Sequence, residues 1–365
     1  MKMKNKSNRI ILVLSLPMLL PILLPILLMV LTISFIHAQV ASPPLNITQH
    51  SFNPAVVAFN PMQKIITLGV RAGEGDGEKN INNTQKETKD ITALEANASL
   101  HMFRLGLEAY SMLQRKDKIK EKLAESTTAS SEKINSAYQV NFAYRPLPPL
   151  SLGFSTGEEQ VTVNYDKTKF KKNGAGIDLM LFNFLYVGAA TFRVSHQSSY
   201  TIENNWWENL GGIALIFAGR SNAIRIEASY STSPEDLCAH KDSNPLAQDD
   251  YHQESKNLVV GGEIYLSEEH VTKFFGGSLD GVILGASKGS EKREPLAASI
   301  AAATNVAASA GSSVEEKIDR LNIWLLLVMI NKKIQLGPSF HQYKSNQDTI
   351  KRSENLILIS AGVMF

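Results

Sequence analysis

The sequence has little of several features that exported proteins commonly use. It contains one cysteine, Cys238, so no disulfide can form within the chain. An exported domain without disulfides must be held by a large core or by a closed sheet. The formal net charge of +2 is too small to indicate a nucleic-acid or acidic partner. After residue 38 no apolar run approaches the ~20 residues of a membrane-spanning helix. A soluble exported protein and a β-barrel membrane protein both remain compatible with these absences.

The N-terminus carries the pattern of a secretory signal peptide. Basic residues in the first nine positions precede an apolar run from Ile10 to Ile36, and Ala38 supplies a small residue for cleavage. Residues 1–38 are therefore predicted to be removed, so that the mature chain begins near Gln39. A retained membrane anchor is the alternative, because the run is long enough to cross a bilayer. Prolines interrupt the run and each removes a helical hydrogen bond, which favours cleavage.

The rest of the chain alternates between polar and apolar residues with the period of two that indicates β-strands. The clearest segments are 137–145, 223–231, 257–267 and 334–343. Weaker candidates are 64–71, 99–112, 149–156, 174–182, 184–198, 208–218, 274–287, 319–330 and 355–365, with a possible extra strand at 159–166. Only two segments, 114–124 and the Ala-rich 296–310, have a composition compatible with a helix. The pattern predicts an all-β chain of about 12 or 13 strands.

Short and long connections alternate between these strands from residue 136 onward. Short turns are expected at 145–149, 182–183, 219–222 and 331–333, and long polar connections at 113–135, 199–207, 233–255, 288–316 and 344–354. An up-and-down outer-membrane barrel has this pattern, with short periplasmic turns and long extracellular loops. A β-sandwich gives no reason for every second connection to be long. We therefore predict an antiparallel transmembrane β-barrel over 63–365, with 12 strands or, alternatively, 14. Strands 64–71 and one more within 72–97 would be needed for 14.

Charged residues fall on the polar faces of the predicted strands. These positions include Arg71, Arg104, Glu108, Arg145, Asp178, Arg225, Glu227 and Glu263. Burying so many charges in a dry core is costly unless they are paired, whereas a water-filled lumen avoids that cost. We therefore expect the polar face to line a lumen and the apolar face to contact lipid. The predicted lumen-lining residues are Arg104, Glu108, Arg145, Arg225, Glu227 and Glu263.

The chain ends in NLILISAGVMF, with apolar residues at alternate positions up to Phe365. This ending resembles the last strand of Gram-negative outer-membrane barrel proteins, and the resemblance in architecture covers about 62–365. It implies that Ile357, Ile359, Ala361 and Val363 face lipid together with Phe365. It also implies a bacterial outer-membrane location, contact with membrane lipid and lipopolysaccharide, and recognition of the last strand by the barrel assembly machinery.

A second resemblance lies near the mature N-terminus, in SFNPAVVAFNPMQK at 51–64. An Asn-Pro-Ala sequence before a first strand is similar to the long-chain fatty-acid transporter family and its aromatic-hydrocarbon relatives. That resemblance implies that 39–62 plugs the lumen, with Asn53, Pro54 and Ala55 meeting the wall, and that apolar substrates leave by a lateral opening. The chain departs from the family in the short stretch before Asn53. A periplasmic segment containing an ordinary Asn-Pro turn is the alternative.

A His-x-Ser pair at the end of the predicted strand 184–198 raises the possibility of an enzyme. His196 and Ser198 share a face with Phe192 and Val194, which we assign to the lipid side near the outer leaflet. The pair resembles that of outer-membrane phospholipase A and of the lipid A deacylase, which implies acyl-ester hydrolysis. Glu203, Asn204 and Glu208 are possible orienting residues. A polar strand end beside an aromatic girdle at Trp206 and Trp207 explains the segment equally well.

Three other segments have simpler explanations. The glycine-rich 73–80 lacks the following apolar helix of a phosphate loop. The acidic, histidine and cysteine residues within 238–252 match no zinc spacing. The Ala-rich 296–313 is either a lumen insert or a surface loop. The sequence thus predicts a cofactor-free and metal-free outer-membrane channel for passive passage of small, possibly hydrophobic molecules. An acyl-ester hydrolase and a structural or adhesive barrel are the alternatives.

Overall fold

The computed structural model describes most of the chain beyond residue 64 and parts of the segment before it. The described residues are 45, 49, 52–59, 65–81, 85–123, 127–163, 166–198, 204–218, 222–237, 251–269, 279–295, 315–347 and 350–365. The predicted signal peptide, its cleavage site, the cysteine-containing loop and the Ala-rich segment therefore lie outside the described residues. In the described part, no helix combines the length and the apolar character needed to cross a membrane.

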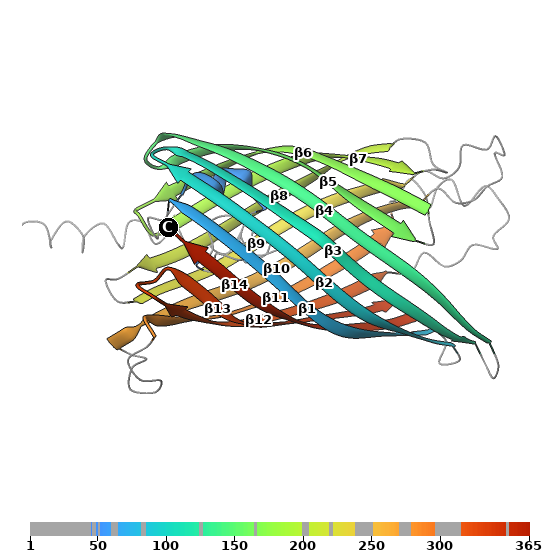
Figure 1. Cartoon of the computed structure of the whole chain (residues 1–365). Coiled ribbons are helices and arrows are strands. Elements are labelled where there is room, and N and C mark those ends of the chain that lie inside the picture. The colour runs from blue at the N-terminus through green and yellow to red at the C-terminus, as the bar shows by residue number, and fades with distance from the viewer. Residues whose placement is uncertain are drawn as a thin grey trace, which may run out of the picture. The chain divides into compact units, whose positions relative to one another are not determined.

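Fourteen antiparallel strands close into a barrel in which each strand pairs with its neighbours in sequence and β1 pairs with β14 (Figure 1). The strands are β1 (Ile66–Ile81), β2 (Gln85–Met102), β3 (Leu105–Leu123), β4 (Thr127–Leu147), β5 (Leu150–Val163), β6 (Asp166–Leu181), β7 (Leu185–Ser198), β8 (Asn204–Ala218), β9 (Asn222–Leu237), β10 (Tyr251–Ser267), β11 (Gly281–Pro295), β12 (Glu316–Met329), β13 (Ile334–Gln347) and β14 (Ile350–Met364). One short 3-10 helix, η1 (Pro54–Ala58), precedes them.

Side chains alternate between the outer and inner faces of the wall, as the period of two predicts. On β14, Ile357 and Ile359 are more than half exposed on the outside, whereas Leu358 and Ser360 are buried on the inside. Phe365 is also exposed, and its backbone bonds to that of Ile66, where β1 begins. The predicted lipid-facing ending is therefore the outer face of the closing strand.

The strand number is 14, the predicted alternative, and the first choice of 12 is wrong. The two additional strands are β1, which contains most of the predicted segment 64–71, and β2, which the sequence did not predict. The segment 99–112, predicted as one strand, contains the hairpin turn between β2 and β3. Phe103 lies at that turn with a left-handed φ of 51°, and the flanking strands continue in register from Met102 and Leu105. The turn has Phe103 and Arg104 in place of the Gly or Asn that usually marks such a turn. The sequence therefore gives no signal for it.

Two of the predicted long connections are also wrong, because the strands extend beyond the apolar segments. The described part of the segment 114–124, which looked compatible with a helix, belongs to β3, which ends at Leu123, and β4 begins at Thr127. The chain likewise passes from Gln347 in β13 to Ile350 in β14 with two residues between them. Polar residues predominate in these extensions, so their alternation carries little apolar signal. The barrel end at which β1 begins and β14 ends is called the terminal end below, and the other is the opposite end.

Candidate functional site: the lumen and the N-terminal segment

Residues from before the first strand lie inside the barrel. The backbone N–H of Leu45 donates to Glu263 Oε2 on β10 at 2.8 Å, and Gln335 Nε2 on β13 donates to the Leu45 carbonyl at 3.3 Å. Asn97 on β2 donates to the carbonyl of Gln49 at 3.3 Å. The described part of this lumen segment (residues 45, 49 and 52–59) thus bonds to strands far apart around the wall.

The Asn-Pro-Ala sequence forms the start of η1 and ties it to the wall. Asn53 Oδ1 accepts from Ala55 N at 3.0 Å, which is the usual role of an Asn N-cap, and Pro54 follows at the first helical position, where its missing N–H costs nothing. Asn53 Nδ2 donates to the Ile177 carbonyl on β6 at 3.2 Å. Ser151 Oγ on β5 donates to the Ala55 carbonyl at 2.6 Å. The Asn-Pro-Ala sequence therefore both caps the helix and, through Asn53 Nδ2 and the Ala55 carbonyl, anchors it to the wall.

Small residues in the wall make room for η1. A Cβ added at Gly153 on β5 would overlap the backbone of Pro54 and Ala55, and one added at Gly176 on β6 would overlap the Asn53 side chain. Ala143 on β4 is fully buried against the helix. Only residues this small allow the backbone of the helix to approach the sheet so closely. The seat for η1 is thus built into β4, β5 and β6.

Three of the predicted lumen-lining charges form one buried group. Arg225 donates to Glu227 on the same strand and through Nη1 to Glu263 Oε2 at 3.4 Å. None of the three side chains is more than 2% exposed, so they do not border open water. Glu263 also accepts the N–H of Leu45. The charges predicted to hydrate a passage instead pair with one another and hold the lumen segment.

The remaining three predicted lumen residues lie in different environments. Glu108 is buried and accepts a bond from Asn141 Nδ2 at 3.0 Å. Arg145 is half-buried, and its guanidinium lies 4.8 Å from the centre of the Phe59 ring, just after η1. Arg104 belongs to no strand: it is exposed in the β2–β3 turn and donates to the Pro146 carbonyl at 2.9 Å. Arg104 therefore lies at the rim of the terminal end.

An apolar stripe runs along the inner face of β7 and β8. From the terminal end it contains Tyr186, Ala190, Phe192 and Val194 on β7 and Ile216, Ala214 and Trp206 on β8, each no more than 6% exposed. At the terminal end the stripe meets the lumen segment, since the Phe59 and Tyr186 rings pack edge to face at 5.4 Å. Toward the opposite end, Phe170 on β6 packs against Trp206 at 6.5 Å. One ion pair interrupts the stripe: Glu208 on β8 is beside Phe192 and pairs with Lys172 on β6, whose amine lies 4.5 Å from the centre of the Phe192 ring. This side of the lumen is thus mainly apolar from the opposite end to Phe59.

Toward the opposite end, the lumen side formed by β11 to β14 and β1 to β3 is charged. Near the terminal end, β10 to β12 instead carry an apolar cluster that packs with Leu45 and contains Tyr265, Ile283, Trp324, Leu326 and Val328. Glu291 on β11 bonds to Arg320 on β12 and to Arg293 on its own strand, and Arg352 on β14 bonds to Glu316. Lys89, Arg115, Asp117 and Glu354 form a second paired group across β1 to β3 and β14. The charged groups near the opposite end are thus largely engaged with one another.

The His-x-Ser pair is not on the lipid side. His196 is 6% exposed and shares the inner face with Phe192 and Val194, whereas the outward Val187 on the same strand is 40% exposed. Our assignment of this face to lipid was wrong. We inferred lipid contact from its apolar residues, but these residues belong to the apolar stripe on the inner face. The His196 ring packs on Phe170 at 4.9 Å, and its Nδ1 atom has no hydrogen-bond partner among the described residues. Ser198 is the last residue of β7. Of Trp206 and Trp207, only Trp207 faces outward, at 55% exposure.

The aromatic packing of His196 leads to a test of the hydrolase alternative. Replacing His196 with Phe should leave the barrel folded, because the ring contacts of an aromatic side chain are retained. We expect no ester cleavage above the no-enzyme rate in either protein, because no described residue orients the imidazole. The measurement is hydrolysis of a long-chain p-nitrophenyl ester by folded protein in detergent. Activity that the wild type has and the variant loses would support the hydrolase instead.

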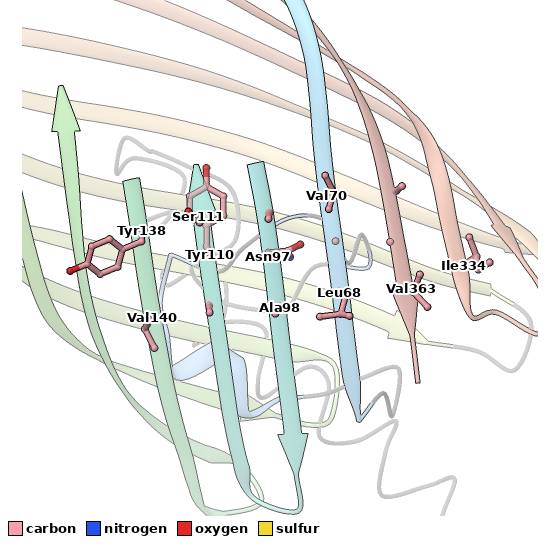
Figure 2. Close-up of a pocket in the computed structure, with 15 residues that line it drawn as sticks. Leu68, Val70, Asn97, Ala98, Tyr110, Ser111, Tyr138, Val140, Ile334 and Val363 are labelled. Carbon is pink, nitrogen blue, oxygen red and sulfur yellow. The ribbon is translucent and has the colours of Figure 1, made fainter. Parts of the chain in front are cut away.

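A bulge and a shallow groove mark the wall between β14 and β4. Leu113 and Gln114 interrupt the pairing of β3 with β4, and inward positions on β3 change from even numbers to odd after them. Beside the bulge, the outer face carries a groove of about 720 Å³ whose lining residues come from β1–β4, β13 and β14 (Figure 2). Its lining includes the small side chains Ala96, Ala98, Ala109 and Ala361. Strands β2 and β3 remain paired across it, from Ala96–Ser111 to Ala98–Ala109, so the groove is a depression in a continuous wall.

The comparisons with known proteins agree with the geometry. No family model and no curated protein matches the sequence. Among solved structures, a deletion mutant of the TodX monoaromatic hydrocarbon channel matches with a TM-score of 0.55 at 10% identity, over 92% of this chain and 98% of that one. The P. putida toluene transporter TodX matches with a TM-score of 0.50 at 10% identity, over 90% and 96% of the two chains. The CymD monoaromatic hydrocarbon channel matches at 0.50 and 12%, over 89% and 94%.

The fold is that of the monoaromatic hydrocarbon channels. Identities of 10–12% establish the fold alone, and the residues of the lumen must carry any statement about function.

Two parts of this site were missed by sequence reasoning. Leu45 carries no signal, because a single leucine bound through its backbone looks like any loop residue. The seat of η1 carries a weak one: Ser151 and Gly153 alternate with the outward Leu152 and Phe154, so small residues replace large ones on the inner face. That pattern indicates close approach of another backbone, but the occupant cannot be read from it.

Proposed function

We propose that this chain is an outer-membrane channel for the passive passage of small apolar molecules, with its N-terminal segment held in the lumen. The observation that carries the proposal is the apolar stripe on β7 and β8, which leads to Phe59. A hydrophilic pore would instead line its path with water-exposed charges, whereas the charges here are paired or enclosed. The proteins with this fold include a channel for monoaromatic hydrocarbons and a toluene transporter. Small aromatic hydrocarbons are therefore the proposed cargo class.

The distribution of apolar side chains supports the outer-membrane location. The outer face carries large exposed side chains such as Leu68, Phe154 and Ile264 around the wall, as expected of a barrel in lipid. In the proposed orientation the terminal end is periplasmic, because chain termini of such barrels lie there. Phe365, exposed on the outer face of the terminal end, is the proposed recognition point for the barrel assembly machinery.

Passage along the stripe is tested by placing a charge in it. Replacing Ala190 with Asp should reduce toluene uptake by roughly tenfold or more, since a carboxylate opposes passage of an apolar molecule by a few kcal/mol. Ala190 is a buried stripe position whose register partners, Gly176 and Leu210, carry no charge. The measurement is uptake of radiolabelled toluene by cells that produce equal amounts of folded protein. The matched control is Asn322→Asp, which adds the same charge to the polar side, where Asn322 already bonds to Ser287 and His341. Equal loss in both variants, or unchanged uptake in Ala190→Asp, would contradict the proposed path.

The lateral exit implied by the family resemblance also belongs to this proposal. The outer groove beside the β3 bulge is its proposed position, because it is apolar and lies on the wall that faces lipid. Because β2 and β3 are paired there, exit through it would require the pairing near the bulge to open. The structural or adhesive alternative needs neither stripe nor groove, and normal toluene uptake in cells that lack the protein would favour it.

A further inference from the structure

Aromatic side chains on the outer face of β6 to β8 indicate where the two membrane boundaries are expected. Near the terminal end, the Phe182 and Phe184 rings stack at 6.1 Å and the Phe184 and Phe217 rings at 5.7 Å. Trp207 lies ten positions from Phe217 on β8 and is 55% exposed. A tilted transmembrane strand needs about 9–11 residues to cross the hydrocarbon, and aromatic residues mark both interfaces. Trp207 therefore lies at the interface of the opposite end.

Two basic residues lie at the level of Trp207. In the strand register, Arg193 on β7 faces both Asn173 on β6 and Trp207 on β8. Lys171 is the next outward residue on β6 after Asn173, so it lies diagonally across from Arg193, within reach of one ligand. Both side chains are exposed. Neither makes an ion pair with any residue that the structure describes. We call Lys171, Arg193 and Trp207 the basic patch.

Several other outward basic residues near the opposite end have acidic partners. Lys169, two positions from Lys171, pairs with Glu158 at 3.1 Å. On β3, Lys116 pairs with Glu132 at 2.7 Å and Lys120 with Asp90 at 3.4 Å. In the strand register Lys171 faces Glu158 on β5, but that carboxylate is bonded to Lys169, so Lys171 and Arg193 leave the basic patch with an excess of positive charge. Its position at an interfacial aromatic residue, above the apolar outer face that includes Ile177 and Val187, fits a ligand with an anionic head and apolar tails.

We propose that Lys171 and Arg193, beside Trp207, bind the phosphate groups of a lipid A-type glycolipid in the outer leaflet. Arg and Lys form charge-assisted hydrogen bonds with phosphate oxygens, and basic residues at a membrane surface attract anionic lipid head groups. The indole of Trp207 lies at the boundary between head group and acyl chains, and the tails lie along Ile177 and Val187. This inference rests on the outer-membrane location proposed above, although it does not depend on the cargo.

The test measures binding of lipid A to the full chain folded in detergent. We expect diphosphoryl lipid A to bind and to raise the unfolding temperature of the wild type. The double variant Lys171→Gln/Arg193→Gln should bind it with an affinity at least about tenfold lower. The matched control is Lys116→Gln/Lys120→Gln on β3, which removes the same charge from paired positions and should bind as the wild type does. Folding of each variant is checked by its heat-dependent mobility in gels.

Several outcomes would overturn the site. Equal weakening in both double variants would reduce the effect to overall charge, and unchanged affinity in Lys171→Gln/Arg193→Gln would remove the patch from binding. Equally tight binding of phosphate-free lipid A would exclude phosphate recognition. Equal protection by inorganic phosphate alone would replace the glycolipid with a free anion. Membrane fractionation reports separately on location: a chain that reaches the outer membrane yet shows no lipid A selectivity refutes only this site.

Discussion

Replacing Gly153 with Val is expected to expel η1 from the barrel and raise ion conductance severalfold. The new side chain would occupy the space of the Pro54 and Ala55 backbone, which cannot move aside while Asn53 stays bonded to Ile177. Overpacking of this kind costs roughly 1–3 kcal/mol, comparable to the two hydrogen bonds that hold the helix. The helix therefore leaves its seat and the β-ladder around it survives. Conductance in planar bilayers is the measurement.

Two further variants separate expulsion of the helix from damage to the wall. Gly211→Val places the same side chain on β8, where the nearest atom to an added Cβ outside the adjacent residues, the Gly188 carbonyl oxygen, is 3.9 Å away. Conductance should not change. Asn53→Leu removes the cap and the bond to Ile177 without adding bulk to the sheet, so it should raise conductance in the same direction. Wild-type conductance in both Gly153→Val and Asn53→Leu would show that η1 does not limit ion flow.

Removal of the Arg225 guanidinium should cause the largest loss of stability. In Arg225→Met, Glu227 and Glu263 remain buried, at 1% exposure each, without the cation that joins them. Removing the cationic partner of buried carboxylates costs roughly 3–5 kcal/mol. We also expect a weaker hydrogen bond between Glu263 and the Leu45 N–H, because Arg225 no longer holds Glu263 in position. The midpoint of urea unfolding, followed by tryptophan fluorescence in lipid vesicles, measures the effect.

The comparison variants for Arg225 test whether the charge itself is responsible. Arg104→Met removes an exposed arginine at the rim and should change stability by roughly 0.5 kcal/mol or less. The triple variant Arg225→Met/Glu227→Gln/Glu263→Gln removes all three charges and should recover most of the loss, since neutral groups are cheaper to bury. A loss in Arg225→Met no larger than in Arg104→Met would mean that water reaches the group.

The closed antiparallel barrel was predictable because it depends on a repeated pattern, which survives errors at single positions. The strand number was less so. Predicting 12 strands required reading the chain between 72 and 97 as irregular, although its residues are merely polar, and β2 contains 85–102. Polar strand extensions stand outside the apolar belt, where neither face needs hydrophobic side chains. Periodicity in hydrophobicity therefore marks only the part of each strand that touches lipid.

Prediction of the lumen was limited by the same rule applied in reverse. An apolar face was assigned to lipid, and for Phe192, Val194 and His196 that assignment failed because β7 is apolar on both faces. The charges of Arg225, Glu227 and Glu263 were placed on the inner face by alternation, but their pairing depends on strands β9 and β10 being adjacent. The Asn-Pro-Ala sequence pointed to the wall, whereas its contacts with Ser151 and Ile177 depend on tertiary folding.

The contacts of the lumen segment also constrain the order of events when the protein is made. Leu45 is held by β10 and β13, strands from the last third of the chain, whereas η1 rests on β4 to β6. The lumen segment can therefore acquire its full set of bonds only after β10 and β13 have joined the wall. Closure of β1 against β14 follows directly, at residues adjacent to the same segment. Placement of the lumen segment and completion of the wall are thus expected to be coupled, because each needs the last strands to be in place.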